Sequence, residues 1–133
     1  MVKKIFISII LVASIVANFN IANAGDIKAG EKIFNKCKAC HGVKEGGKNK
    51  LGPNLWNIID RPKGNIEGFA YSKNLAEFGG KWTYEGLNKF LYKPKQYIKG
   101  TKMNFAGLKN AQDRADLILW LQQHSDNPIP LPE

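Results

Sequence analysis

Cys37-Lys38-Ala39-Cys40-His41 constrains this chain more than any other segment. On a helical turn, residues three and four positions apart share one face, so both thiols and the imidazole can meet one edge of a flat group. This C-x-x-C-H spacing is the attachment sequence of c-type haem. We therefore expect Cys37 and Cys40 to form thioethers to one haem and His41 to bind its iron as the proximal ligand.

Three other interpretations use the same residues. A structural zinc site needs about four nitrogen or sulfur ligands, and beyond the motif the chain offers only His124. A C-x-x-C redox dithiol is typical of a βαβ setting, and the sequence contains no such pattern. A plain disulfide between Cys37 and Cys40 is the third alternative. The motif with its histidine favours haem over all three.

The size of the chain agrees with a large bound group. Its 133 residues predict one domain with a small core. Many small exported domains add several disulfides, but the only two cysteines here lie three positions apart and cannot link distant segments. A buried cofactor would organise the interior instead.

Residues 1–24 have the pattern of a secretory signal peptide. Lys3 and Lys4 form a short basic region, residues 5–16 are apolar almost throughout, and Ala22-Asn23-Ala24 matches the small-x-small cleavage pattern. Cleavage after this triplet would release a periplasmic protein. The apolar run is short for a membrane span, which needs about 20 residues, so an uncleaved anchor is the minor alternative.

The mature chain is expected to be basic. The full sequence has a formal charge of +9, and removal of two lysines with no acidic residue leaves +7. Such a protein binds acidic surfaces. Nucleic acid and anionic lipid would also suit the charge, but neither suits an exported protein with this cysteine motif.

Capping residues predict an all-α fold with long irregular loops. Pro94 fits the first turn of one short helix. The other helices are expected to begin at four N-cap residues: Asp26, Ser72, Thr83 and Asn110. Glycine and proline predict loops over 42–54, 62–68 and 100–108. Loops of this length in a compact domain indicate function or a bound group. We expect a domain over 25–125 and a mobile, proline-rich tail over 126–133.

Met103 is the candidate sixth ligand of the iron. Apart from Met1 it is the only methionine, and it lies in a loop far downstream of His41. A thioether is soft and neutral, and it raises the reduction potential relative to a second imidazole. His124 is the competitor, but it lies near the end of the last predicted helix, where we expect it to face water.

At this point the chain, over nearly all of 25–125, resembles the class I c-type cytochromes: mitochondrial-type cytochrome c and its soluble bacterial counterparts. The segments that carry the resemblance are Gly25-Asp26, Gly30, Ile33-Phe34, Cys37 to His41, Gly52-Pro-Asn-Leu55, Gly68-Phe69, Tyr71, Trp82, Pro94, Tyr97-Ile98, Gly100-Thr-Lys-Met103, Phe105-Ala-Gly107 and Asp116-Leu117. The resemblance implies three main helices, with short helices and long loops, wrapped around one covalently bound haem. It also implies that the first and last helices cross at Gly30 and Phe34.

The resemblance implies further roles around the haem. Pro53 would offer its carbonyl to the second ring nitrogen of His41, which orients the ring and makes it a better donor. Thr101 would supply a hydroxyl on the methionine side. The residues that match the surroundings of the haem propionates are Arg61, Tyr71 and Trp82.

Three positions depart from the family pattern. Phe90 stands where the family often has a tyrosine that bonds the methionine sulfur. Leu75 replaces a polar asparagine, which predicts a drier haem wall. Lys99 replaces a frequent proline beside Gly100, which predicts a looser ligand loop.

The sequence predicts an electron carrier without enzymatic activity. Two axial ligands leave no open position on the iron. Lysines flank the motif and the methionine loop, and as a set they would steer the protein onto acidic partners: Lys36, Lys38, Lys48, Lys50, Lys93, Lys95, Lys99, Lys102 and Lys109. By resemblance, those partners are the acidic docking surfaces of a quinol–cytochrome c reductase and a terminal cytochrome c oxidase, and the carrier is a monomer that binds no nucleic acid.

Two other functions compete with this prediction. A haem enzyme or gas sensor would need iron without a sixth protein ligand. An electron-entry subunit fixed in a larger enzyme would need a hydrophobic surface patch and would co-purify with its partner.

Overall fold

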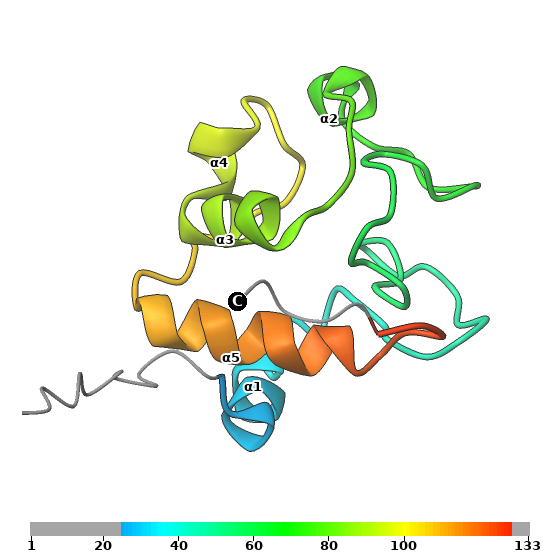
Figure 1. Ribbon diagram of the computed structural model, residues 1–133. Coiled ribbons are helices and arrows are strands. Elements are labelled where there is room, and N and C mark those ends of the chain that lie inside the picture. Colours follow the sequence, from blue (N-terminus) through cyan, green and yellow to red (C-terminus); the bar gives the residue numbers. More distant parts are fainter. Residues whose placement is uncertain (1–24, 129–133) are drawn as a thin grey trace, which may run out of the picture.

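The computed structural model describes residues 25–128, and it is helical as the sequence predicts. The helices are α1 (Ile27–Phe34), α2 (Lys73–Glu77), α3 (Tyr84–Tyr92), α4 (Pro94–Tyr97) and α5 (Ala111–Gln122) (Figure 1). Over these residues the β-structure is one isolated bridge between Pro62 and Lys81. The expected signal peptide and residues 129–133 of the expected tail lie outside the described part of the chain. Between residues 25 and 128, no helix is long and apolar enough to cross a membrane.

The helix starts confirm the capping predictions. Asp26 accepts hydrogen bonds from the backbone N–H groups of Lys28 and Ala29 at the start of α1. The other side-chain caps act in the same way on α2, α3 and α5: Ser72, Thr83 and Asn110. Pro94 occupies the first turn of α4, where its missing N–H costs nothing.

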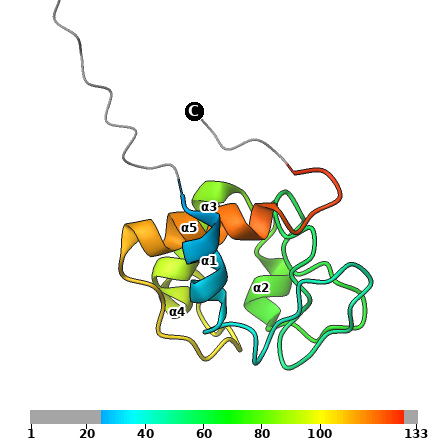
Figure 2. The same ribbon diagram turned by 90° about the horizontal axis from the view of Figure 1, so that it is seen from below.

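The crossing of α1 and α5 joins the two ends of the domain (Figure 2). Gly30 lies so close to α5 that a methyl group at this position would fall 2.6 Å from Cβ of Trp120 and would also overlap the carbonyl of Asp116. The ring of Phe34 packs 4.5 Å from that of Trp120. The Asp26 N–H donates to Asp116 Oδ1 at 2.7 Å. The crossing therefore requires glycine at position 30, because any side chain would separate the helices.

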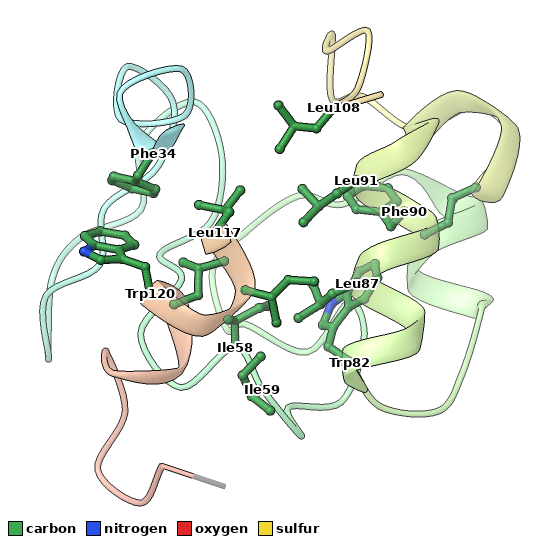
Figure 3. Close-up of a cluster of buried hydrophobic side chains, with 13 residues drawn as sticks. Phe34, Ile58, Ile59, Trp82, Leu87, Phe90, Leu91, Leu108, Leu117 and Trp120 are labelled. Carbon is green, nitrogen blue, oxygen red and sulfur yellow. The ribbon is translucent and has the colours of Figure 1, made fainter. Parts of the chain in front are cut away.

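The core lies where α3 packs against α5 (Figure 3). Thirteen buried apolar side chains form it, including Leu87, Leu91 and Leu117. The buried guanidinium of Arg114 donates to the Asn88 side chain at 2.6 Å and to the Leu108 carbonyl at 2.8 Å, so its charge is solvated by the protein. The long loops that hold the candidate site residues extend from this core.

The C-terminal end of the domain differs from the sequence expectation for His124. Its ring is half-buried and lies 3.9 Å from the ring of Trp120, and its Nδ1 is 2.9 Å from the Trp120 carbonyl. Asp126, the first residue of the expected tail, donates its backbone N–H to the Asn57 side chain at 2.9 Å. Aromatic stacking and this long-range hydrogen bond hold both residues against the domain.

Candidate functional site

The cysteine motif forms an extra turn directly after α1. The Cys37 N–H donates to the Phe34 carbonyl at 2.8 Å. The N–H groups of Cys40 and His41 both donate to the Cys37 carbonyl at 3.0 Å. This turn gives the two cysteines and the histidine the i, i+3, i+4 spacing of one helical face. Both cysteines are half-buried, and Cys37 packs against the core.

The His41 ring is fixed by the loop that follows the motif. Its Nδ1 lies 2.7 Å from the Pro53 carbonyl oxygen, to which the ring N–H donates. Gly52 packs its backbone onto the ring, and a methyl group there would lie 2.8 Å from Nδ1. The Gly52 N–H donates to the Cys40 carbonyl at 2.8 Å, which ties the loop back to the motif. With Nδ1 engaged, Nε2 is the nitrogen left for a metal.

Burial sets the protonation of the motif. Desolvation lowers the pKa of His41, and the charges of Arg61 and Lys50 add to this, although the hydrogen bond to Pro53 opposes them. The imidazole is therefore neutral at neutral pH, which is the form that binds a metal. Desolvation, aided by Cys40, raises the pKa of the Cys37 thiol to about 11. Reactive C-x-x-C dithiols have depressed thiol pKa values, so this environment disfavours the redox-dithiol alternative.

Asn54 organises the glycine-rich loop over 42–54, and sequence reasoning missed this role. Its buried amide donates to the carbonyls of Lys44 and Gly47 at 2.9 and 2.8 Å. Its side-chain oxygen accepts from the Trp56 N–H at 2.7 Å, an Asx turn. An asparagine directly after Pro53, in a loop with several glycines, was the sequence feature that could have indicated such a turn. These contacts hold the Pro53 carbonyl in position for His41.

Backbone pairing brings Arg61 and Trp82 together. The Trp82 N–H donates to the Arg61 carbonyl, and the Trp82 carbonyl accepts from the Asp60 N–H, both at 2.9 Å. The Arg61 guanidinium donates to the carbonyls of Asn54 and Trp56 at 2.8 and 3.1 Å. Burial lowers the Arg61 pKa, and Tyr71 opposes this shift. Arg61 and Trp82, two of the three residues that the resemblance places around the haem propionates, are thus joined by a backbone hydrogen bond. Tyr71, the third, lies close enough to shift the pKa of Arg61.

The methionine loop follows α4. Met103 is half-buried and packs against the core. Its backbone N–H donates to Thr101 Oγ1 at 3.3 Å, so Thr101 shapes the loop directly. The Phe90 ring is buried 5.0 Å from that of Trp82, and Leu75 packs half-buried against the same core. Two of the three departures from the family pattern, Phe90 and Leu75, therefore contribute apolar surface to the core region.

Comparisons with known proteins agree with this site. The family model for cytochrome c matches residues 27–125. The chain belongs to the cytochrome c family. It is 48% identical over 95 residues to a cytochrome c homolog of Rickettsia prowazekii, covering 71% of this chain and 54% of that protein. It is 47% identical over 108 residues to the cytochrome c of Chlamydomonas reinhardtii, covering 80% of this chain and 96% of that protein.

The chain thus spans about half the length of the bacterial homologs that it matches. It covers 96% of the cytochrome c of Chlamydomonas reinhardtii and 96% of that of Ginkgo biloba, to which it is 46% identical. The family assigned from the sequence is confirmed.

The residues present suit the cofactor of a cytochrome c. Two thiols and a neutral imidazole share one turn, and a glycine leaves room for the imidazole ring. Beside the buried core lie apolar side chains that remain partly exposed and that a large apolar group would cover: Leu55, Leu75, Tyr97, Met103 and Phe105. As a member of the family, the chain holds one haem c, attached covalently through Cys37 and Cys40.

Gly52→Ala is predicted to disturb the His41 ring. The added methyl group must push the ring away from the Pro53 carbonyl, since it would otherwise lie 2.8 Å from Nδ1. We expect a loss of about 1–3 kcal/mol in the free energy of unfolding, measured with denaturant, together with an altered visible spectrum.

Gly42→Ala is the matched control, because a methyl group there meets its nearest neighbour at 3.6 Å. We expect this control to stay within about 0.5 kcal/mol of the parent protein. Equal stability and identical spectra for the two variants would contradict the close packing of Gly52 on His41.

Proposed function

We propose that this cytochrome c is a one-electron carrier without enzymatic activity, in which His41 and Met103 are the two axial ligands of the iron. The observation that carries the proposal is the His41 ring, whose Nδ1 is engaged by the Pro53 carbonyl at 2.7 Å while Nε2 is left for the metal. Haem iron supplies the one-electron couple between its ferric and ferrous states.

The surroundings of Met103 support its role as the second ligand. The side chain is half-buried against the core, and the Thr101 hydroxyl shapes the loop that carries it. His124, the competing ligand, is stacked on Trp120 and bonded to a carbonyl of its own helix. A protein ligand on each side of the iron leaves no position for oxygen or peroxide, which separates a carrier from a haem enzyme or gas sensor.

Met103→Ala is predicted to open the iron to added ligands. The reduced holoprotein should bind carbon monoxide, the spectrum should become high-spin, and the reduction potential should fall because a soft thioether is lost. Visible spectroscopy with and without carbon monoxide measures the change.

Asn104→Ala, at the exposed neighbouring position, is the control and should leave the spectra unaltered. If Met103→Ala instead leaves the oxidised and reduced spectra unchanged, another group is the sixth ligand.

The lysines beside the motif and the methionine loop are proposed to steer docking. All nine are exposed. Some also shape the surface, since Lys50 Nζ donates to the Lys38 carbonyl at 2.9 Å and Lys102 Nζ donates to the Ala70 carbonyl at 2.8 Å. Exposed charges contribute little singly, and their summed field speeds encounter with acidic surfaces. The partners we propose are a quinol–cytochrome c reductase and a cytochrome c oxidase, visited by a freely diffusing monomer.

Charge reversal tests this docking surface. Lys36→Glu, next to the motif, should slow electron transfer with an acidic partner while leaving the haem spectrum intact. The rate should also fall as salt rises, because the Debye length is about 10 Å at 0.1 M. Stopped-flow kinetics over a salt series measures both effects.

Lys28→Glu is the control for net charge, since it lies eight residues earlier, about 12 Å away at the helical rise of α1. Equal slowing by both variants would mean that net charge alone steers the protein. A rate independent of salt would favour a subunit fixed permanently in a larger enzyme.

Export to the periplasm is proposed from the signal-like residues 1–24. The packing of Gly25 supports a domain that begins there, because a methyl group on it would lie 2.9 Å from the Ala115 carbonyl oxygen of α5. The intact mass of the purified protein should equal that of residues 25–133 plus one haem. Recovery of the full-length chain from membranes would overturn cleavage and favour an anchored carrier.

A further inference from the structure

The methionine loop of this chain lacks a constraint that its family frequently has. Lys99 stands where a proline is common, so its backbone torsion φ is not fixed by a ring. Gly100, the next residue, adopts φ +71°, a conformation that glycine permits and that gives the loop further freedom. The segment between the buried Ile98 and Met103 would therefore have many conformations in the absence of another contact.

A side chain from α2 makes that contact. Asn74 Nδ2 donates to the Lys99 carbonyl oxygen at 2.6 Å. The two residues are 25 positions apart in the sequence. The same amide lies against Gly100, 3.5 Å from where a methyl group on that residue would sit. Asn74 thus engages the backbone at the place where the family frequently uses proline.

Two further contacts join the surroundings of α2 to the methionine loop and to α4, the helix that precedes it. Lys102 Nζ donates to the Ala70 carbonyl at 2.8 Å, just before α2. The Phe78 ring, directly after α2, lies 5.3 Å from that of Tyr97 in α4. Figure 1 shows α2 standing apart from the α1–α5 crossing. These contacts join it to the methionine loop and to α4, while its Leu75 side chain packs against the core.

We propose that Asn74 is a positioning residue that holds the methionine loop closed in place of the missing proline. The proposal rests on the proposed ligation by Met103. Asn74 itself touches no ligand; it acts by fixing the Lys99 carbonyl, and with it the loop backbone that leads to Met103. Loss of this hydrogen bond should raise the population of molecules in which Met103 has left the iron.

The direct test is imidazole binding to the oxidised holoprotein, which requires that Met103 leave. Asn74→Ala should raise the affinity for imidazole roughly fivefold, the change expected from losing one ordinary hydrogen bond. Asn74→Asp should do the same, because a carboxylate of nearly the same shape cannot donate to a carbonyl. Amide hydrogen exchange should accelerate at Thr101, whose N–H donates to the Ile98 carbonyl at 3.2 Å, and at Met103.

Gln96→Ala is the matched control. It removes an exposed amide from α4 that lines the same surface hollow as Asn74. Imidazole affinity and loop exchange should stay at the parent values in this variant.

Lys99→Pro supplies a rescue. The backbone of Ile98 already has φ −124° and ψ 99°, close to the conformation that a residue before proline prefers. Combined with Asn74→Ala, Lys99→Pro should therefore return imidazole affinity toward the parent value. A purely structural role for Asn74 would lower thermal stability without this selective effect on imidazole binding and without rescue.

The outcomes separate the two proposals. If Met103→Ala raises imidazole affinity in the same assay but Asn74→Ala and Asn74→Asp do not, the ligation stands and the role of Asn74 is wrong. If Met103→Ala itself has no effect, Met103 is not the ligand and both proposals fall.

Discussion

The structure depends on holding one imidazole ring at a fixed orientation beside two thiols. The His41 ring lies between the Pro53 carbonyl, which engages Nδ1, and the Gly52 backbone, which leaves no room for a side chain. A ring free to rotate could present either nitrogen, whereas this one presents Nε2. Burial also keeps the imidazole neutral, so tautomer and protonation state are both prepared before a metal is bound.

Two distant parts of the chain maintain that orientation. On one side, the close crossing at Gly30 fixes α1, and the motif turn continues from the end of that helix. On the other side, Asn54 bonds the loop carbonyls, and its own carbonyl accepts from the Arg61 guanidinium. The first support is apolar packing and the second is a polar network. Because a network is specific only when each member is satisfied, the complete bonding of Asn54 matters as much as its burial.

Features determined by neighbouring residues could be predicted from the sequence. A capping side chain bonds the backbone two or three residues later, so Asp26 and Asn110 mark their helices without help from the rest of the fold. The cysteine motif is equally local. The half-buried position of His124 could not be predicted, because it depends on contacts with Trp120 and on the course of the chain beyond α5. No local pattern distinguishes a histidine that stacks on tryptophan from one that faces water.

The same distinction applies to Lys99, whose effect on the loop stays a prediction. Taken alone, the replacement of proline predicts a looser loop, since only the local restriction of φ is visible in the sequence. Asn74 donates a hydrogen bond to the Lys99 carbonyl and so restrains the same backbone. Its neighbour Leu75 is also a departure from the family pattern. Proline restricts the chain in the folded and unfolded states alike, whereas a hydrogen bond acts only once α2 and the methionine loop have met. In this cytochrome c, the proposed closure of the methionine loop therefore requires that α2 stays packed against it. The single hydrogen bond from Asn74 of α2 would then affect how firmly Met103 is held at the iron site.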